Sequence, residues 1–477
     1  MRELGVGLVY WPALDELLVP GAAPVSVVEL EPQTLWHQTA DAAQWCYRGN
    51  PALLDHVAAL PLPKLIHGIG QPLGGTVPDP LDYLSLLRQA VERLDPAWVS
   101  EHLSFNRIRR EGTVEHAGFL LPARQSPAAV RVAAHNIDAF RRALGRPVAF
   151  ETGVNYLRRQ PGEMDDGEFF AAVSRAADSG ILLDLHNLWC NERNGGQGVA
   201  DALEQLPLER VWEIHLAGGM EESGYWLDAH SGAVPSEVLD IAAELIPRLP
   251  RLGAIIYEVL PEHVAQLGLD GVRRQIDELQ RLWTMRRPRV VRLADLPPAA
   301  PSIGVEPQPQ DIAEAAAWET ALVDTLRAQA RLPPTVPVAG DDPGLTLLAR
   351  LVGDFRSASL ARALHYTMTA LLAGLGPRDT QHLLAAYFGA HPPEPFAAIE
   401  ADRFARFLAA RLPLLPRLAY LDEVLAFEHA LVRAAIHGTS SDIAWSADPL
   451  ALIASLDAGR LPRSLPPVNS VMRICAD

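Results

Sequence analysis

Residues 180–188 read GILLDLHNL, and residues 210–219 read RVWEIHLAGG. Both stretches are continuous apolar runs without polar alternation, a pattern typical of strands buried on both faces of a parallel sheet. Six more runs of this kind occur at 4–10, 25–32, 64–70, 97–105, 147–154 and 253–260. Segments with helical periodicity separate them, such as 82–94, 126–144 and 166–180. Eight buried strands alternating with helices predict an α/β fold, a (β/α)₈ TIM barrel over residues 1–292.

The remainder of the chain has a different composition. Residues 293–310 are rich in Pro and Ala and lack periodicity, so we expect an extended linker there. From 311 to 477 the sequence is rich in Ala, Leu and Arg at helical spacing, without an intervening strand pattern. These features predict a second, smaller, all-α domain over residues 311–477.

Overall composition narrows the class of protein. The 477 residues carry a net charge of −17, which argues against nucleic-acid binding because phosphate contacts need clustered Lys and Arg. The three cysteines, Cys46, Cys190 and Cys475, have no CxxC spacing, which fits a reducing compartment and excludes a cysteine-based zinc or iron–sulfur motif. Neither a signal peptide nor a membrane-spanning apolar stretch is evident. We therefore expect a cytoplasmic protein without nucleic-acid or membrane partners.

Ionisable side chains gather at the ends of the predicted strands. In a barrel of this kind, residues at the C-terminal ends of the strands build the active site. Seven of the eight strands end on side chains that can bind metal: Glu29, His67, Glu101, His102, Glu151, Asp184, His186, Asn187, His215 and Glu258. The loop after the seventh strand adds Asp228 and His230 as D-x-H.

A single His or Glu at a strand end is usually a hydrogen-bonded structural residue. The same feature on seven strands favours a metal centre, because ionisable groups that converge in one barrel mouth need compensating cations. Imidazole mixed with carboxylate, without thiolate, suits iron, manganese or zinc. The candidates outnumber the ligands of one ion, so we expect two or three ions with bridging carboxylates. Oxygen chemistry would favour iron, and hydrolysis would favour zinc or manganese.

Several motifs, taken in order, resemble those of a known family. They are HGIG (67–70), SEHLSFN (100–106), ETGVNYL (151–157), LLDLHNLWCN (182–191), IHLAGG (214–219), WLDAHSGAVP (226–235) and YEVLPEH (257–263). In this order and approximate spacing the chain resembles the multinuclear non-heme iron-dependent oxidative enzymes (MNIO, MbnB/TglH-like) over residues 4–265. The resemblance implies a TIM barrel related to xylose isomerase.

The resemblance also implies an activity and a set of ligands. Family members bind two or three irons in mixed Fe(II)/Fe(III) states and use O₂ as co-substrate. They modify residues, commonly cysteine, in a ribosomally synthesised precursor peptide (RiPP maturation). The implied ligands are His67, His102, Glu151, Asp184, Asn187, His215, Asp228, His230 and Glu258, with Glu29 supporting the site. Two positions depart from the family: Gly219 replaces a second His of HLAGH, and His186 replaces the first Asn of D-x-N-N.

The C-terminal region has a resemblance of its own. FARFLAARLPLLPRLAYLDEVLAFEHALVRAA (404–435) is similar to the helical partner proteins encoded beside such enzymes. It implies a fused partner or peptide-recognition module, where other members need a separate partner; a dimerisation or packing domain is the alternative. For the whole protein, two other functions fit a barrel of this kind. One is a divalent-metal sugar isomerase or phosphodiesterase of the xylose isomerase-like class, and the other is a non-catalytic scaffold.

Overall fold

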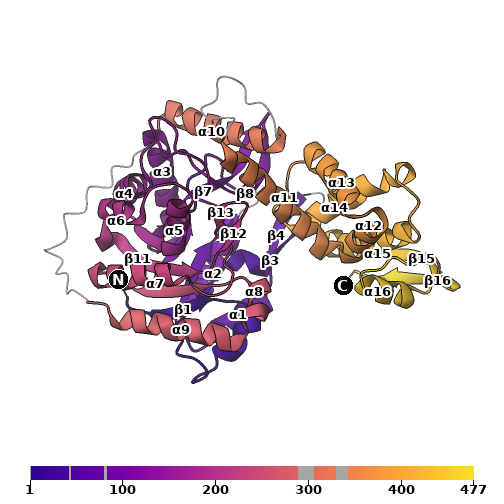
Figure 1. The fold of residues 1–477 in the computed structure, drawn as a ribbon, viewed down its shortest axis with the longest axis horizontal. Helices are drawn as coiled ribbons and strands as arrows, with labels where there is room; N and C mark the ends of the chain where they lie inside the picture. The colour runs from indigo at the N-terminus through magenta and orange to yellow at the C-terminus, as the bar shows by residue number, and fades with distance from the viewer. Residues whose placement is uncertain (1, 42–43, 80–82, 288–305, 329–341, 477) are drawn as a thin grey trace.

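The computed structural model describes residues 2–41, 44–79, 83–287, 306–328 and 342–476. Eight parallel strands close into a barrel (Figure 1). In sheet order they are β1 (Gly5–Val9), β14 (Ala254–Glu258), β11 (Val211–Ala217), β10 (Gly180–Asp184), β9 (Val148–Glu151), β6 (Val99–His102), β5 (Lys64–Gly68) and β2 (Val27–Leu30). β2 pairs with β1 and completes the circle. Each strand lies inside one of the eight apolar runs, so the predicted barrel is confirmed.

Helices form the outer layer of the barrel. They are α1 (Pro51–Ala59), α2 (Tyr83–Leu94), α3 (Pro127–Leu144), α4 (Asp166–Ala177), α5 (Leu185–Arg193), α6 (Val199–Gln205), α7 (Ser236–Leu245), α8 (Pro261–Leu267) and α9 (Leu269–Thr284). Between β1 and β2 the connection is a short 3₁₀ segment, η1 (Pro12–Leu17). The buried faces of these helices and of the strands form one large apolar cluster.

Three small antiparallel pairs rise from the C-terminal ends of barrel strands. They are β3 (Trp36–Asp41) with β4 (Gln44–Gly49), β7 (Ser104–Arg110) with β8 (Thr113–Pro122), and β12 (Met220–Glu222) with β13 (Tyr225–Leu227). The first pair follows β2, the second follows β6 and the third follows β11. All three therefore border the mouth of the barrel, where the predicted ligands lie.

The two-residue period of a strand explains how those ligands reach the mouth. A compact apolar cluster, which includes Leu65, Ala149, Leu182 and Ile256, combines residues from seven of the eight barrel strands with Leu4 and Trp98. Two positions further along the same strands stand His67, Glu151, Asp184 and Glu258. Because residues i and i+2 point to the same face, each strand carries an apolar side chain in the barrel interior and an ionisable one at its mouth.

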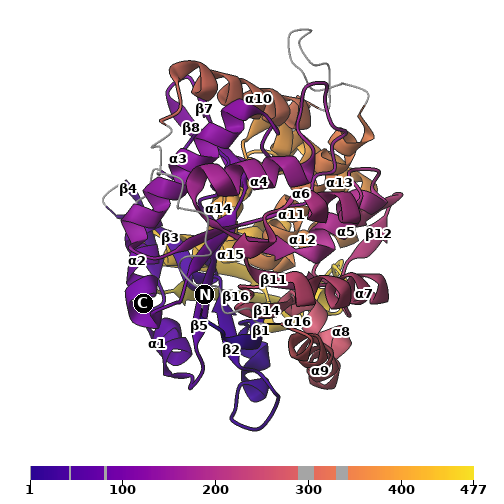
Figure 2. The same ribbon diagram turned by 90° about the vertical axis from the view of Figure 1, so that its left-hand side faces the viewer.

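Helix α10 (Pro309–Ala328) packs on the barrel and not with the C-terminal helices alone. Both views place it beside β7 and β8 (Figures 1 and 2). Its Trp318 and Leu322 share an apolar cluster with Phe105 of β7, and α10 also lies along α3. Most of the predicted linker, residues 293–305, lies outside the described residues, and 309–310 begin α10.

Helix α11 (Pro343–Ala363) joins the barrel to a C-terminal bundle, because its first half packs in the cluster of α10 and Leu360 packs in the bundle core. The bundle contains α12 (His365–Leu375), α13 (Pro377–Ala390), α14 (Ala397–Ala409), α15 (Leu421–His437) and α16 (Pro449–Asp457). It also contains an antiparallel pair, β15 (Ser441–Ala447) with β16 (Pro467–Ile474).

The all-α description of residues 311–477 is therefore wrong for β15 and β16. The region is largely helical, but Ile443, Trp445 and Ala447 alternate with exposed residues, as expected of a strand that covers a core with one face. Among the described residues, none of the helices is long and apolar enough to cross a membrane.

Candidate metal centre

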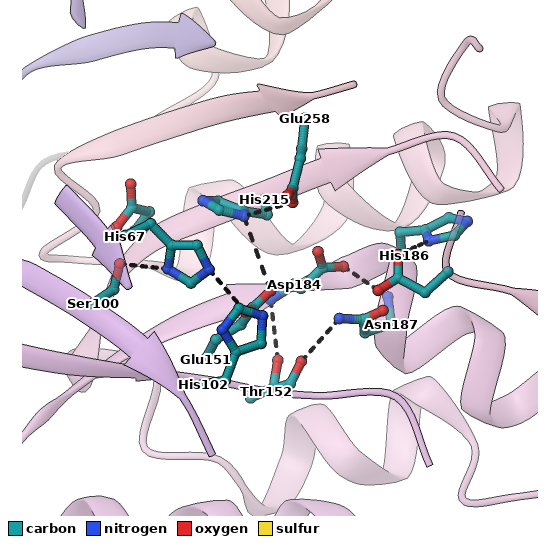
Figure 3. A network of polar contacts seen from close by, with 12 residues as sticks. His67, Ser100, His102, Glu151, Thr152, Asp184, His186, Asn187, His215 and Glu258 are labelled. Atoms are coloured by element: carbon teal, nitrogen blue, oxygen red, sulfur yellow. Dashed lines mark hydrogen bonds and ion pairs between the residues drawn. The ribbon is translucent and has the colours of Figure 1, made fainter. Parts of the chain in front are cut away.

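The first group of candidate ligands is His67, His102 and Glu151, from three adjacent strands (Figure 3). Glu151 Oε2 lies 3.2 Å from His67 Nε2 and 2.9 Å from His102 Nε2. The other ring nitrogens are occupied: His67 Nδ1 lies 2.9 Å from Ser100 Oγ, and His102 Nδ1 donates to Gly68 O over 3.0 Å. A hydrogen bond at Nδ1 leaves Nε2 as the free nitrogen, which is how a protein prepares imidazole for metal.

The second group is Glu151, Asp184, His215 and Glu258, all of them buried. His215 Nδ1 lies 3.1 Å from Glu258 Oε2 and 4.0 Å from Glu151 Oε1. Glu151 therefore belongs to both groups, with Oε2 toward the histidine pair and Oε1 toward His215. A carboxylate shared in this way can bridge two ions.

Asp184 and Asn187 owe their orientation to the start of α5. Asp184 is the N-cap residue, and its Oδ1 accepts the Asn187 N–H at 2.7 Å. Asn187 Nδ2 donates to Thr152 O at 3.3 Å, and Thr152 Oγ1 accepts the Asp184 N–H at 3.0 Å. These bonds use one polar atom of each side chain and leave Asp184 Oδ2 and Asn187 Oδ1 free to bind a ligand.

The loop between β13 and α7 brings Asp228 and His230 over this centre. His230 Nδ1 lies 3.1 Å from Glu258 Oε1, and His230 Nε2 lies 2.8 Å from Asp228 Oδ1. The backbone of His230 has a φ of 45°, in the left-handed region that few non-glycine residues adopt. Tyr156 holds the loop from the other side, because its hydroxyl oxygen accepts the Asp228 N–H at 3.1 Å.

The electrostatics of the cluster test whether a cation fits. Several of its buried atoms make no hydrogen bond with the described residues: Glu151 Oε2, Asp184 Oδ2, Asn187 Oδ1, Asp228 Oδ1 and His230 Nε2. Orphaned polar atoms are rare in protein interiors, since each costs free energy. Burial, with the charges of Asp228 and Glu151, also raises the pKa of Asp184 well above its ordinary value. Unpartnered oxygens on Asp184 and Asn187, beside several buried carboxylates that face imidazole nitrogens, fit bound cations.

A third group, Glu29, Glu213 and His215, lies beneath the second. Glu29 Oε1 approaches His215 Nε2 to 2.8 Å, on the ring nitrogen opposite Glu258. Glu213 accepts the Trp98 indole N–H at 2.7 Å, and burial together with the charge of Glu29 raises the pKa of Glu213 well above its ordinary value. A raised pKa disfavours the carboxylate form that binds metal, so this group is better suited to orienting His215 than to holding an ion.

Comparison with known proteins assigns the chain to a family. Residues 26–259 match the family model "RiPP precursor modification enzyme MbnB/TglH/ChrH", where RiPP denotes a ribosomally synthesised, post-translationally modified peptide. A UPF0276 protein of Anaeromyxobacter sp. (strain Fw109-5) is 32% identical over 239 residues, which cover 50% of this chain and 82% of the relative. The chain belongs to this family.

A second relative of this RiPP modification enzyme gives the same family assignment. A UPF0276 protein of Chromobacterium violaceum is 35% identical over 229 residues, covering 48% of this chain and 81% of the relative. Solved structures resemble it distantly. Among them are D-psicose 3-epimerase from Clostridium cellulolyticum H10 (TM-score 0.36, 10% identity, 60% of this chain and 97% of that one) and a xylose isomerase domain protein from Planctomyces limnophilus (TM-score 0.37, 15% identity, 59% and 97%).

The structure brings the nine predicted ligands of this RiPP modification enzyme into one cluster at the barrel mouth. That they bind metal stays a prediction. Glu101, also at a strand end, is used elsewhere: its carboxylate accepts the His102 N–H at 3.0 Å and the Gln71 N–H at 3.2 Å.

One residue beside the centre was missed from the sequence. Glu31 is buried, and burial together with the charge of Glu258 raises its pKa to about 7 against the opposing influence of nearby histidines. The signal was present, because Glu31 follows Glu29 by two residues and comes directly after β2.

Proposed function

We propose that this enzyme uses iron and O₂ to oxidise cysteine residues in a ribosomally synthesised precursor peptide. One observation carries the proposal: Glu151 is shared by two buried groups of His and carboxylate ligands in a chain of the RiPP modification family. A shared carboxylate between nitrogen- and oxygen-rich positions suits a multinuclear centre of first-row metals. Iron in such a centre would supply the redox chemistry that O₂-dependent oxidation requires.

The residues of the chain have distinct tasks in this proposal. His67 and His102 would hold one ion through Nε2, with Glu151 between them. Asp184, His215 and Glu258 would hold a second ion on the other side of Glu151. The apolar cluster below the ligands leaves the mouth as the route by which a peptide side chain enters. The protein's share is to position the cysteine and to limit access of water.

We propose further that residues 311–477 contribute peptide recognition. In the bundle, Leu414, Leu450 and Val471 are among the most exposed large apolar side chains, at 81%, 73% and 68%. A cavity of about 530 Å³ next to Leu412 is lined also by Tyr420, Arg417 and Asp422, which mixes apolar surface with both charges. Tethering such a surface to the barrel raises the effective concentration of a bound peptide near the metal centre.

Co-expression with a candidate precursor peptide that contains cysteine tests the function. The purified protein is expected to contain iron by elemental analysis, and the peptide is expected to change mass only when O₂ is present. High-resolution mass spectrometry should place the change on a cysteine. A peptide with that Cys replaced by Ser is the matched control and should remain unmodified.

Two results would contradict the proposal. One is a modification that persists without O₂ or on the Ser peptide. The other is a protein that contains stoichiometric zinc and no iron, which would favour hydrolysis or isomerisation on the same barrel. To test the recognition module separately, peptide affinity is measured for the wild-type protein and for Leu450→Asp with Val471→Asp. A loss of affinity with unchanged metal content supports it, and unchanged affinity contradicts it.

A further inference from the structure

Glu101 is a fully buried carboxylate near the end of β6 that belongs to none of the three candidate metal groups. Neighbouring residues of a strand point to opposite faces, so Glu101 points away from the barrel interior while His102 points into the mouth. On the same outer face Val99, two residues earlier, packs in the apolar layer between strands and helices. An ionisable group in such a layer costs free energy unless it is well partnered, so its partners indicate its role.

Both carboxylate oxygens of Glu101 are hydrogen-bonded. Oε1 accepts the backbone N–H of His102 at 3.0 Å and lies 3.6 Å from Nδ1 of the same residue. Oε2 accepts the Gln71 N–H at 3.2 Å and the Tyr83 hydroxyl at 3.3 Å. One carboxylate thus connects a candidate ligand to the loop of residues 68–71, which follows β5, and to helix α2.

The two glycines of the HGIG motif leave the space that these side chains occupy. A Cβ atom on Gly68 would lie 2.4 Å from Glu101 Oε2, and one on Gly70 would lie 2.4 Å from the Tyr83 ring. Real Cβ atoms do not make contacts this short, so a larger residue at either position would displace the carboxylate or the ring. The motif is therefore explained by the packing of Glu101 and Tyr83 against the loop backbone.

The loop in turn sets the ring of His102. Gly68 O accepts the Nδ1–H of His102 at 3.0 Å. Two residues further on, Gly70 O accepts a hydrogen bond at 2.8 Å from Nη1 of Arg107, a buried guanidinium. A loop fixed at several backbone atoms keeps its Gly68 carbonyl aimed at the imidazole. The other ring nitrogen, Nε2, then lies 2.9 Å from Glu151 Oε2.

We infer that Glu101 is a positioning residue: it holds the main chain of His102 and the loop 68–71, and the imidazole thereby presents Nε2 to a metal ion. Glu101 contacts neither metal nor substrate in this role. The inference rests on the proposed function in one respect, namely that His67, His102 and Glu151 bind a metal ion. A partner behind a metal-binding histidine orients the ring and strengthens binding.

Chelator competition on the full-length protein, loaded anaerobically with Fe²⁺, tests the inference. Glu101→Gln keeps the shape of the side chain but replaces one accepting oxygen by an NH₂ group, which cannot accept from a backbone N–H. Metal affinity at the position lost in His102→Ala is expected to fall at least about tenfold, in the range known for residues that support metal ligands. Affinity at the position lost in His215→Ala should keep its wild-type value, because His215 faces Glu29 and Glu258.

Glu428→Gln is the matched control. Glu428 is also buried, and its two oxygens accept the backbone N–H groups of Tyr366 and Thr367 in the C-terminal bundle, at 2.8 and 2.7 Å. The control loses the same kind of hydrogen bond, so it should lower the free energy of unfolding comparably and leave both metal affinities unchanged. An equal loss of metal affinity in Glu428→Gln would reveal a general effect of stability and overturn the inference.

Gly68→Ala provides an independent test, because the added Cβ atom displaces the Glu101 carboxylate without removing its charge. We expect it to weaken the same metal position as Glu101→Gln does. In the double variant the two losses should not add, as is usual for residues in contact. Wild-type affinity in Gly68→Ala, or full additivity in the double variant, would contradict the role of Glu101.

A measurement on the unmutated protein does not depend on the folding of a variant. In NMR spectra of the Co²⁺-loaded protein, the Nδ1–H of His102 should give a paramagnetically shifted signal that exchanges slowly with water, because Gly68 O and Glu101 hold it. A rapidly exchanging signal would contradict the inference. If the wild type binds no first-row metal, the proposed function fails and the inference fails with it. If the wild type binds metal and Glu101→Gln binds it equally at both positions, the inference alone fails.

Discussion

The substitution Glu29→Gln tests how the centre is supported from below. Glu29 is completely buried, and its Oε1 lies 2.8 Å from Nε2 of His215. The other ring nitrogen, Nδ1, faces Glu258 Oε2 at 3.1 Å. A carboxylate at Nε2 favours the tautomer that carries its proton there, which leaves the Nδ1 lone pair for a metal ion. Gln has the same shape as Glu and lacks the charge that selects this tautomer.

The expected effect is a weaker site with unchanged stoichiometry. Loss of a partner behind a metal-binding histidine typically costs about 10–100-fold in metal affinity. Since a factor of ten corresponds to about 1.4 kcal/mol, Glu29→Gln should weaken binding at the His215 position by about 1.4–2.8 kcal/mol. Metal binding at His67 and His102 should change little, because Ser100 and Gly68 contact the Nδ1 atoms of these rings without involving Glu29.

Competition with a chelator under anaerobic conditions measures the affinity, and circular dichroism verifies folding. Glu237→Gln is the matched control, because Glu237 is a surface residue that bonds to Trp189 and Arg193. Wild-type affinity in Glu29→Gln would refute the tautomer argument. Loss of a complete equivalent would refute it differently, by showing that Glu29, Glu213 and His215 form a metal site themselves.

Three further predictions concern α10. Leu322→Ala removes a fully buried side chain and should cost about 2–5 kcal/mol of unfolding free energy in urea, whereas the exposed Ile312→Ala should change it by less than about 0.5 kcal/mol. Burial raises the pKa of Glu319 from 4.5 to about 7, although two hydrogen bonds from Thr76 oppose the rise. Between pH 4.5 and 7 the Glu319 carboxyl group is therefore protonated in the folded state and ionised in the unfolded state. Stability should therefore fall by up to about 3 kcal/mol as pH rises through this range, and this slope should be absent in Glu319→Gln. A protein ending at residue 287 should bind the exposed-surface dye ANS and should hold less metal than the full chain.

The strands and their ligands were predictable because both follow a local rule. Apolar runs mark buried parallel strands, and a strand places every second side chain on the same face. Leu182 and Asp184 are neighbours in this sense, as are Leu65 and His67, so a list of strand ends is also a list of residues at the barrel mouth. The same rule would have added Glu31, which follows Glu29 by two residues.

Other features depend on contacts between distant parts of the chain. Nothing near Gly219 in the sequence indicates that the ring of His186, 33 positions earlier, occupies the space where a side chain at position 219 would lie. β15 and β16 likewise pair across a helix, and only the alternation of Ile443 and Trp445 marked the first of them. Periodicity gives the face that an element buries, but it does not say against which partner.

Helix α10 and the start of α11 show why the partner matters for function. Gly344 of α11 approaches the loop after β9 so closely that a Cβ atom on it would lie 2.1 Å from Tyr156 O. Tyr156 and Leu227 pack in the same apolar cluster as Trp318, and the Tyr156 hydroxyl oxygen accepts the Asp228 N–H. The segment after the predicted linker is thus connected, through Tyr156, to the loop that carries two candidate ligands. Because the loop's position depends on this packing, removal of the C-terminal region should disturb Asp228 and His230 before it disturbs His67, His102 and Glu151, which are fixed by barrel strands.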